Sequence, residues 1–240
     1  MLTVDNLTCG YGDITAVHGL SFAVGKGEIF AMLGANGAGK TSTIMCLAGH
    51  VVASSGSVTL GGTNITNLPA QARIGHGMAL VPEGRRVFAE LSVEENLVVG
   101  GHTVDAYELA ANLERIFGHF PRLGERKTQA AGSLSGGEQQ MLAIGRALMA
   151  NPQLVLIDEL SLGLMPKAID ACYEVLQALK ADGLSILLVE QNTTRVLDIA
   201  DHVLVLESGV KSWEGTGAEA DGNSALLEAY LGTGGVTGSR

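Results

Sequence analysis

The chain has few cysteines, no long apolar segment and a shortage of positive charge. Its cysteines are Cys9, Cys46 and Cys172 among 240 residues. Their isolation argues against disulfides or a cysteine-rich metal site and favours a reducing cytosol. No apolar run approaches the roughly 18 residues that a membrane-spanning helix needs. The N-terminus has no basic segment followed by an apolar one, so we expect no secretory signal.

The charge balance narrows the range of partners. The chain has 25 acidic and 15 basic residues, a formal net charge of −10, so we expect no binding to nucleic acid or other polyanions. Any association with a membrane is expected to depend on a protein partner. The length allows one large domain, or a core with an inserted subdomain.

A complete phosphate-binding loop is present at residues 34–41, Gly-Ala-Asn-Gly-Ala-Gly-Lys-Thr. It lies between an apolar run at 28–33, typical of a buried strand, and residues 42–49, whose spacing suits one helix face. The motif requires this order of strand, loop and helix. A glycine-rich turn with a surface lysine is the alternative interpretation, which the complete motif in the right context disfavours.

The chemistry of this loop indicates nucleotide binding. Its glycines let backbone N–H groups and a helix N-terminus surround a phosphate chain. Lys40 would reach the β- and γ-phosphates, and the Thr41 hydroxyl would bind Mg²⁺. The residues predicted to bind ATP in this loop are Asn36, Gly37, Ala38, Gly39, Lys40, Thr41 and Ser42.

A second motif is Leu154-Val-Leu-Ile-Asp158-Glu159, an apolar strand that ends in two acids. Ligands of open α/β sheets bind at the carboxyl ends of the strands. Asp158 would hold Mg²⁺, through a water, and Glu159 would polarise the attacking water as general base. A strand can also end in an acid because it leaves the core, but the phosphate loop upstream favours the functional interpretation.

A third motif, Leu134-Ser-Gly-Gly-Glu-Gln-Gln140, leads into a helix rich in alanine and leucine. Ser135 is predicted to cap this helix, with Gly136 and Gly137 in its first turn. Glycine is a poor helix former, so two of them here suggest that something approaches the backbone closely, and the helix N-terminus favours an anion. A helix cap with nothing bound is the alternative.

The remaining pattern predicts an α/β fold. Apolar runs at 154–157, 185–189 and 203–206 alternate with helical spacing at 169–179 and 193–200. This alternation predicts a mostly parallel sheet covered on both faces.

The first half of the chain adds short strands and a helical zone. Strands are predicted at 2–4, 20–24 and 57–60, with a turn at Gly61-Gly62. Helices are predicted at 104–120 and 139–149, and Pro121 breaks the first of them.

The three motifs, in this order, resemble the ATP-binding cassette family of transporter ATPases, over about residues 1–231. By this resemblance, Tyr11 corresponds to the aromatic residue that stacks on adenine; the alternative is a partly buried core tyrosine. Residues 161–164, Ser-Leu-Gly-Leu, correspond to a loop that faces a partner cassette. Glu83 stands where most cassettes carry a metal-contacting glutamine, and Gln191 where most carry a histidine that contacts the γ-phosphate.

The residues at 83 and 191 are departures that resemble one subgroup, which energises bacterial uptake of branched-chain amino acids. Glu83 keeps an oxygen ligand for Mg²⁺. Gln191, predicted to be catalytic with Glu159, keeps an N–H donor for phosphate but cannot carry a proton. Leu160 is a further departure, because the family normally has proline there; leucine frees φ and leaves the aim of Glu159 open.

The resemblance implies a single P-loop NTPase domain over 1–240. A core at about 1–87 and 149–231 would carry a small N-terminal antiparallel β subdomain. A helical subdomain would be inserted at about 88–148, and a mobile tail would cover 232–240. Two cassettes would pair head to tail, so that Ser135, Gly136 and Gly137 of one cover the ATP of the other.

The implied partners are a second, homologous cassette, two transmembrane permease subunits and, indirectly, a periplasmic binding protein. The chain would then lie peripherally on the cytoplasmic face of the inner membrane. Three alternatives stay open: a cassette for another cargo such as urea, amides or exported lipid, an ATPase of DNA repair or translation, and a non-catalytic regulatory cassette.

Overall fold

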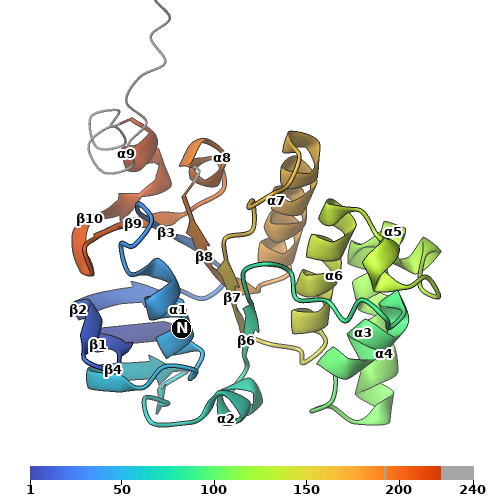
Figure 1. The fold of residues 1–240 in the computed structure, drawn as a ribbon, viewed down its shortest axis with the longest axis horizontal. Coiled ribbons are helices and arrows are strands. Elements are labelled where there is room, and N and C mark those ends of the chain that lie inside the picture. Colours follow the sequence, from blue (N-terminus) through green and yellow to red (C-terminus); the bar gives the residue numbers. More distant parts are fainter. Residues whose placement is uncertain (192, 223–240) are drawn as a thin grey trace, which may run out of the picture.

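The computed structural model describes residues 1–191 and 193–222. Figure 1 shows an antiparallel sheet at one side, helices at the other and a second sheet between them. The predicted tail at 232–240 lies outside the described residues, as does the end of the predicted core beyond residue 222.

A six-stranded sheet forms the centre of the molecule. Its order is β10 (Val210–Thr216), β9 (His202–Glu207), β3 (Ile29–Leu33), β8 (Ser185–Glu190), β7 (Leu154–Asp158) and β6 (Met78–Val81). Every pairing is parallel except that between β10 and β9. The predicted mostly parallel sheet is therefore confirmed.

This sheet is buried on both faces. In β3, Ile29, Ala31 and Leu33 face the core cluster that contains α6 (Gly136–Leu148) and α7 (Pro166–Ala181). The alternate residues, Phe30 and Met32, face α1 (Lys40–Leu47) and the antiparallel sheet. Burial on both faces explains why these strands are uninterrupted apolar runs in the sequence.

The antiparallel sheet near the N-terminus has the order β2 (Ile14–Val24), β1 (Leu2–Tyr11), β4 (Ala53–Leu60) and β5 (Thr63–Asn64). The predicted strands were only parts of these, because exposed polar residues alternate with buried ones along β1 and hide its length. The predicted turn at Gly61-Gly62 is confirmed, with both residues at positive φ.

Helices between β6 and β7 pack on the face of the sheet opposite α1 (Figure 1). They are α3 (Val93–Gly100), α4 (Ala106–His119), α5 (Pro121–Glu125) and α6, with a short 3₁₀ turn, η1 (Ala131–Ser133). Pro121 ends α4 as predicted and also starts α5, where its missing N–H costs no hydrogen bond.

Three shorter helices complete the described fold: α2 (Ala70–Gly75), α8 (Thr193–Leu197) and α9 (Gly217–Asp221). The helix predicted at 193–200 is thus shorter than expected. Among the described helices, none is long and apolar enough to cross a membrane.

Candidate nucleotide site

Four neighbouring strands bring the predicted site residues to one edge of the central sheet. The phosphate loop follows β3, Gln191 follows β8, Glu159 follows β7, and Glu83 follows β6. These strands are adjacent and parallel, so all four segments leave at their carboxyl ends. Residues more than a hundred positions apart in the chain are therefore gathered where ligands of such sheets bind.

Two glycines of the phosphate loop leave no room for a Cβ. Gly39, at φ 101°, directly precedes α1, and a Cβ there would lie 2.7 Å from the Ala16 carbonyl oxygen. A Cβ on Gly34 would lie 2.4 Å from the Leu206 carbonyl oxygen. No side chain caps the start of α1, which leaves its first N–H groups available to an anion.

Lys40 is almost fully buried inside this loop. Its Nζ donates to the carbonyl oxygens of Gly34, at 2.8 Å, and Ala35, at 3.0 Å. Burial lowers the pKa of Lys40, while the charges of Glu159 and Asp158 oppose that shift. A buried ammonium held by neutral carbonyls can exchange them for phosphate oxygens, which carry full charge.

Thr41 and Asp158 form a hydrogen-bonded pair whose oxygen atoms could bind a metal ion. The Thr41 hydroxyl donates to Asp158 Oδ1 at 3.3 Å. Within the described part of the chain, the fully buried Asp158 Oδ2 has no hydrogen-bond partner. Burial, with a contribution from the charge of Glu159, raises the pKa of Asp158 to about 6. A buried carboxylate oxygen beside a hydroxyl is a donor set that suits a hard cation.

The backbone of Glu159 and the side chain of Gln191 together fix the position of the Glu159 carboxylate. The φ of Glu159, 49°, lies in the left-handed region, and its N–H donates to the Val189 carbonyl at 3.0 Å. Gln191 Nε2 donates to Glu159 Oε1 at 2.6 Å. Leu160, the residue in place of the usual proline, is fully buried in the core. Its side chain therefore anchors the segment that carries Glu159.

Glu190 is a site residue that we did not predict from the sequence. It is 1% exposed, and its carboxylate accepts hydrogen bonds from the Ser161 N–H and hydroxyl, both at 2.8 Å. Burial raises its pKa, although these hydrogen bonds oppose the shift. The available signal was an acid that ends the apolar strand β8, the same pattern that pointed to Asp158 in β7.

Tyr11 and Glu83 lie at the margins of the site. Tyr11 ends β1 and is 52% exposed, so it is not a core tyrosine. Two residues earlier, Cys9 Sγ contacts the Ser42 carbonyl oxygen at 3.7 Å, which brings this strand end close to α1. Glu83 is exposed, and its charge contributes to the raised pKa of Asp158.

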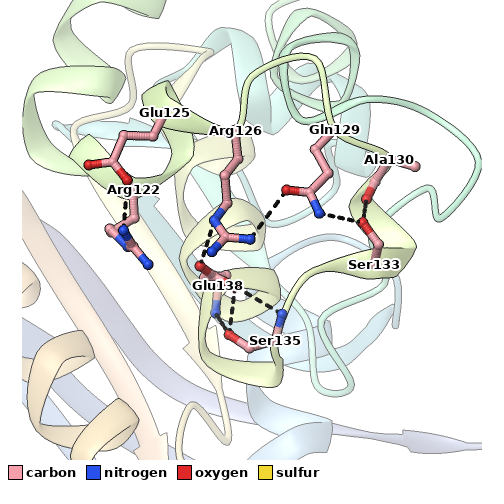
Figure 2. A network of polar contacts seen from close by, with 8 residues as sticks. All are labelled: Arg122, Glu125, Arg126, Gln129, Ala130, Ser133, Ser135 and Glu138. Carbon is pink, nitrogen blue, oxygen red and sulfur yellow. Dashed lines mark hydrogen bonds and ion pairs between the residues drawn. The ribbon is translucent and has the colours of Figure 1, made fainter.

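Ser135 caps α6 in a reciprocal arrangement with Glu138. The Glu138 N–H donates to Ser135 Oγ at 3.3 Å, and the Ser135 N–H donates to Glu138 Oε2 at 3.0 Å. Figure 2 shows this turn and the ion pair of 3.1 Å between Glu138 and Arg126 Nε. The predicted helix cap is therefore present, and it is complete within one chain.

At the two glycines that follow Ser135, the groups that approach the backbone closely include residues of the same chain. A Cβ on Gly137 would lie 2.8 Å from the Ala168 Cβ, and one on Gly136 would lie 3.1 Å from Arg85 Nη1. Moreover, α6 packs on the face of the central sheet opposite α1. In the described residues, no hydrogen bond or ion pair joins residues 135–137 to the phosphate loop.

The amino-acid sequence that contains these motifs matches a known protein family. A family model described as "ABC transporter" matches residues 17–161, more than half of the chain. The matched segment includes the phosphate loop, the Ser135 turn and the acid pair at 158–159. The chain belongs to the ABC transporter family. It carries the ATP-binding cassette, and it is an ATPase of that family.

The relatives of this cassette extend over nearly its whole length. It is 46% identical to the "High-affinity branched-chain amino acid transport ATP-binding protein BraG" of Pseudomonas aeruginosa, over 97% of this chain and 100% of that protein. It is 37% identical to a "Probable branched-chain amino acid transport ATP-binding protein LivF" of Archaeoglobus fulgidus, over 91% and 93%.

A solved structure of "the ADP conformation" of an ATP-binding cassette superposes on this cassette with a TM-score of 0.86. The two chains are 28% identical, and the match covers 97% of this chain and 98% of that one. The predicted family, its similarity to the branched-chain subgroup and the P-loop fold class are therefore confirmed. The roles of individual side chains stay predictions.

Proposed function

We propose that this cassette is the ATP-hydrolysing subunit of an importer for branched-chain amino acids, acting at the cytoplasmic face of the inner membrane. The observation that carries the proposal is the 46% identity to BraG over 97% of the chain. Glu83 and Gln191, the two departures that resemble this subgroup, lie at the same sheet edge as the phosphate loop, which supports the assignment.

Binding of ATP would use the phosphate loop and Tyr11. Amides at the start of α1 and Lys40 Nζ would hold the phosphates, once Lys40 releases the Gly34 and Ala35 carbonyls. The exposed ring of Tyr11 would stack on adenine. The hydrolytic step would then depend on Glu159, which accepts a proton from water, and on Gln191, which orients Glu159.

A magnesium ion would be held by Thr41, Asp158 and Glu83. The unpaired, buried Asp158 Oδ2 fits such an ion within the described structure, and Mg²⁺ would supply positive charge that stabilises the phosphates during transfer. Asp158 has to be ionised for this role. Its pKa of about 6 allows ionisation at neutral pH.

The complete catalytic site would lie between two cassettes. Residues 135–137 begin a helix on the opposite face of the sheet from the phosphate loop, so in this arrangement they do not close the loop of their own chain. We propose that they cover the ATP of a second, homologous cassette in a head-to-tail pair. The γ-phosphate would draw the two cassettes together, and hydrolysis would release them.

A groove between α2, β6 and the helices α3 and α6 would receive the permease subunits. It has a volume of about 530 Å³, and Phe88 and Val99 are exposed in it. Its lining includes His50, Arg86 and Arg146 and no acidic residue, although the chain as a whole carries a net charge of −10. An apolar permease segment bearing a carboxylate would complement this groove.

This groove separates the two lobes of the proposed domain division, a core at about 1–87 and 149–231 and a helical subdomain at about 88–148. Movement of one lobe against the other would alter the groove and so transmit the ATP cycle to the permease. The periplasmic binding protein would act only through the permease.

The proposal can be tested in liposomes that contain this cassette, its partner cassette and the two permease subunits, with the binding protein added outside. We expect leucine-loaded binding protein to stimulate both leucine uptake and ATP hydrolysis. Lys40→Ala should abolish both activities and weaken ATP binding. Lys26→Ala, an exposed lysine before the amino end of β3 and so at the opposite end of that strand from the phosphate loop, is the matched control.

The alternatives predict different results. Stimulation by urea or an amide, and not by leucine, would indicate the other-cargo alternative. Hydrolysis that no transported solute affects would favour a role in repair or translation. Lack of turnover by the assembled wild-type complex would favour a regulatory cassette. Unchanged ATP affinity in Lys40→Ala, measured by calorimetry, would overturn the phosphate-loop assignment itself.

A further inference from the structure

The segment that follows Glu83 has an unusual backbone. Gly84, Arg85 and Arg86 have φ values of 79°, 65° and 49° in succession. The left-handed region is unfavourable for residues with a Cβ, and two adjacent arginines there are exceptional. Such a conformation persists only where surrounding contacts determine it. The side chain of Arg85 provides such contacts.

Arg85 joins two elements that are distant in the sequence. Its Nη1 donates to Gln139 Oε1 in α6 at 3.3 Å, and its Nη2 donates to the Gly163 carbonyl oxygen at 3.2 Å. The guanidinium also lies against the first turn of α6, where a Cβ on Gly136 would meet both Nη atoms within 3.1–3.2 Å. One side chain thus touches the Ser135 turn and the loop after β7.

Arginine suits this position because of its shape rather than its charge. Within the described structure Arg85 makes no ion pair, and both acceptors are neutral. The planar guanidinium presents several donors in a fixed fork, so it can reach two acceptors on different elements at once. A lysine ammonium is a single point and could not hold this pair of contacts.

The three joined segments all carry predicted site residues. Arg85 is two residues from the metal-binding candidate Glu83, Gln139 follows residues 135–137 on α6, and Gly163 lies in the loop that begins after Glu159. We propose that Arg85 is a positioning residue, which holds these three segments in one fixed relation. The inference rests on the proposed shared site, because residues 135–137 and 161–164 would both face the partner cassette.

The test is Arg85→Ala in the full-length chain, assayed with its partner cassette. Alanine keeps the Cβ, and hence the backbone preference, but removes both contacts. Because misplaced catalytic groups lose rate rather than binding, we expect kcat to fall about 10- to 100-fold. The KM for ATP should change by no more than about two-fold, and the unfolding midpoint should fall by no more than a few degrees, since only two partly exposed hydrogen bonds are lost.

A matched control is Arg115→Ala. Arg115 also bridges a side-chain amide oxygen, that of Asn151 at 2.9 Å, and a backbone carbonyl, that of Leu148 at 3.4 Å. It is exposed and touches none of the predicted site residues. This variant therefore also loses an arginine with two hydrogen bonds, but at a place away from the site. Its kcat should equal that of the wild type.

A double-mutant cycle with Gln139→Ala tests the contact directly. If Arg85 acts through Gln139, the double variant should be no slower than Arg85→Ala alone, and Arg85→Lys should recover only part of the rate. Strictly additive effects would overturn the inference. So would an increase in KM with kcat unchanged, which would mean direct nucleotide binding, or a fall in the unfolding midpoint that parallels the loss of kcat.

Failure of this inference is distinguishable from failure of the proposed function. If Arg85→Ala is as active as the wild type while Lys40→Ala is inactive, the ATPase assignment stands and the positioning role is wrong. If Lys40→Ala also keeps full activity, the proposed function itself is wrong.

Discussion

Gln191 and Glu159, both predicted to be catalytic, touch in the structure, and their contact suggests a different role for each. The sequence alone does not show this contact. Gln191 Nε2 donates to Glu159 Oε1 at 2.6 Å, so the amide orients the carboxylate without competing for its proton. An amide cannot take up a proton from water. Of these two residues, therefore, only Glu159 has the chemistry of the predicted general base.

We expect Glu159→Gln to lower ATP hydrolysis by about 10² or more, the size of a general-base effect. The substitution keeps the shape and hydrogen bonding of the side chain, so ATP should still bind and should hold the two cassettes together. Single-turnover hydrolysis and equilibrium ATP binding measure the two effects separately. Glu174→Gln, an exposed glutamate of α7, is the control. Turnover within a few-fold of wild type would show that another group activates the water.

Asp158 makes stability depend on pH in a predictable direction. Burial raises its pKa from 3.8 to about 6 in the folded chain, so between these pH values the folded chain binds more protons than the unfolded chain. The contribution of Asp158 to the free energy of unfolding therefore falls as pH rises from about 4 through 6. Ionisation of this buried carboxylate, which the proposed metal site requires, therefore lowers the stability of the nucleotide-free chain.

Asp158→Asn should consequently stabilise the nucleotide-free chain at pH 7.5, by up to about 3 kcal/mol, and abolish hydrolysis. Below pH 4 the stability difference between variant and wild type should disappear. Urea unfolding at both pH values measures it, and groups that titrate in both proteins cancel in the comparison. A variant that is less stable than wild type at pH 7.5 would contradict the role of burial.

At the scale of elements, Glu190 ties the end of β8 to the loop after β7. Its carboxylate accepts from Ser161 twice, from the Tyr173 hydroxyl at 3.4 Å and from the Gln191 N–H at 3.3 Å. Leu160 anchors the same loop from the core side. The loop that would meet a partner cassette is thus held by the Glu190 carboxylate and by the buried side chain of Leu160.

Glu190→Gln should loosen this loop, because its amide NH₂ replaces one of the two carboxylate oxygens that accept from the Ser161 N–H and hydroxyl. We expect a loss of about 2–3 kcal/mol in the free energy of unfolding, typical of a broken buried network, and a fall in kcat larger than the change in KM. Tyr173→Phe removes only the longest contact and should cost less than about 1 kcal/mol. Equal effects of the two substitutions would mean that Glu190 is not the anchor.

The predictability of the elements follows from how much of each is buried. The strands β3, β7, β8 and β9, with apolar runs, were predicted, whereas β6 has four residues and β10 is mostly polar. The start of α3 was missed although Ser92 and Glu95 form a capping box. Glu190 and Arg85 could not be assigned, because their partners lie in segments that only the folded topology brings near.

At the scale of the whole molecule, the two helix starts that we predict to bind phosphate lie on opposite faces of one sheet. They are the start of α1, in the phosphate loop, and the start of α6, at Ser135. The structure offers this separation as support for a site shared between two chains. A test has to show that the Ser135 turn of one chain serves a nucleotide on another.

Mixing two defective variants provides that test. Lys40→Ala damages the phosphate loop, and Gly136→Asp damages the Ser135 turn. Position 136 is the better choice of the two glycines, because a Cβ on Gly137 would clash with Ala168 at 2.8 Å. An aspartate at 136 would meet the Arg85 guanidinium instead, and would place a carboxylate where the partner's γ-phosphate should bind.

Each variant alone would make pairs in which both shared sites are damaged. A mixed pair would contain one site built from two intact halves, so mixing should restore part of the ATP turnover. We expect at most about a quarter of the wild-type rate, since half the pairs are mixed and each has one of two sites. The assay needs high protein concentration, or matched variants in the natural partner cassette, because the cognate pair is a heterodimer in our proposal.

The outcomes separate a shared site from a simple helix cap. If Gly136→Asp alone hydrolyses ATP normally, residues 135–137 only cap α6, as the complete Ser135–Glu138 box within one chain would allow. If the wild-type cassettes associate with ATP but mixing restores nothing, the two halves do not complement each other across an interface. Recovery that grows with the fraction of mixed pairs, and disappears when Lys40→Ala and Gly136→Asp are combined in one chain, is the result that a head-to-tail ATPase requires.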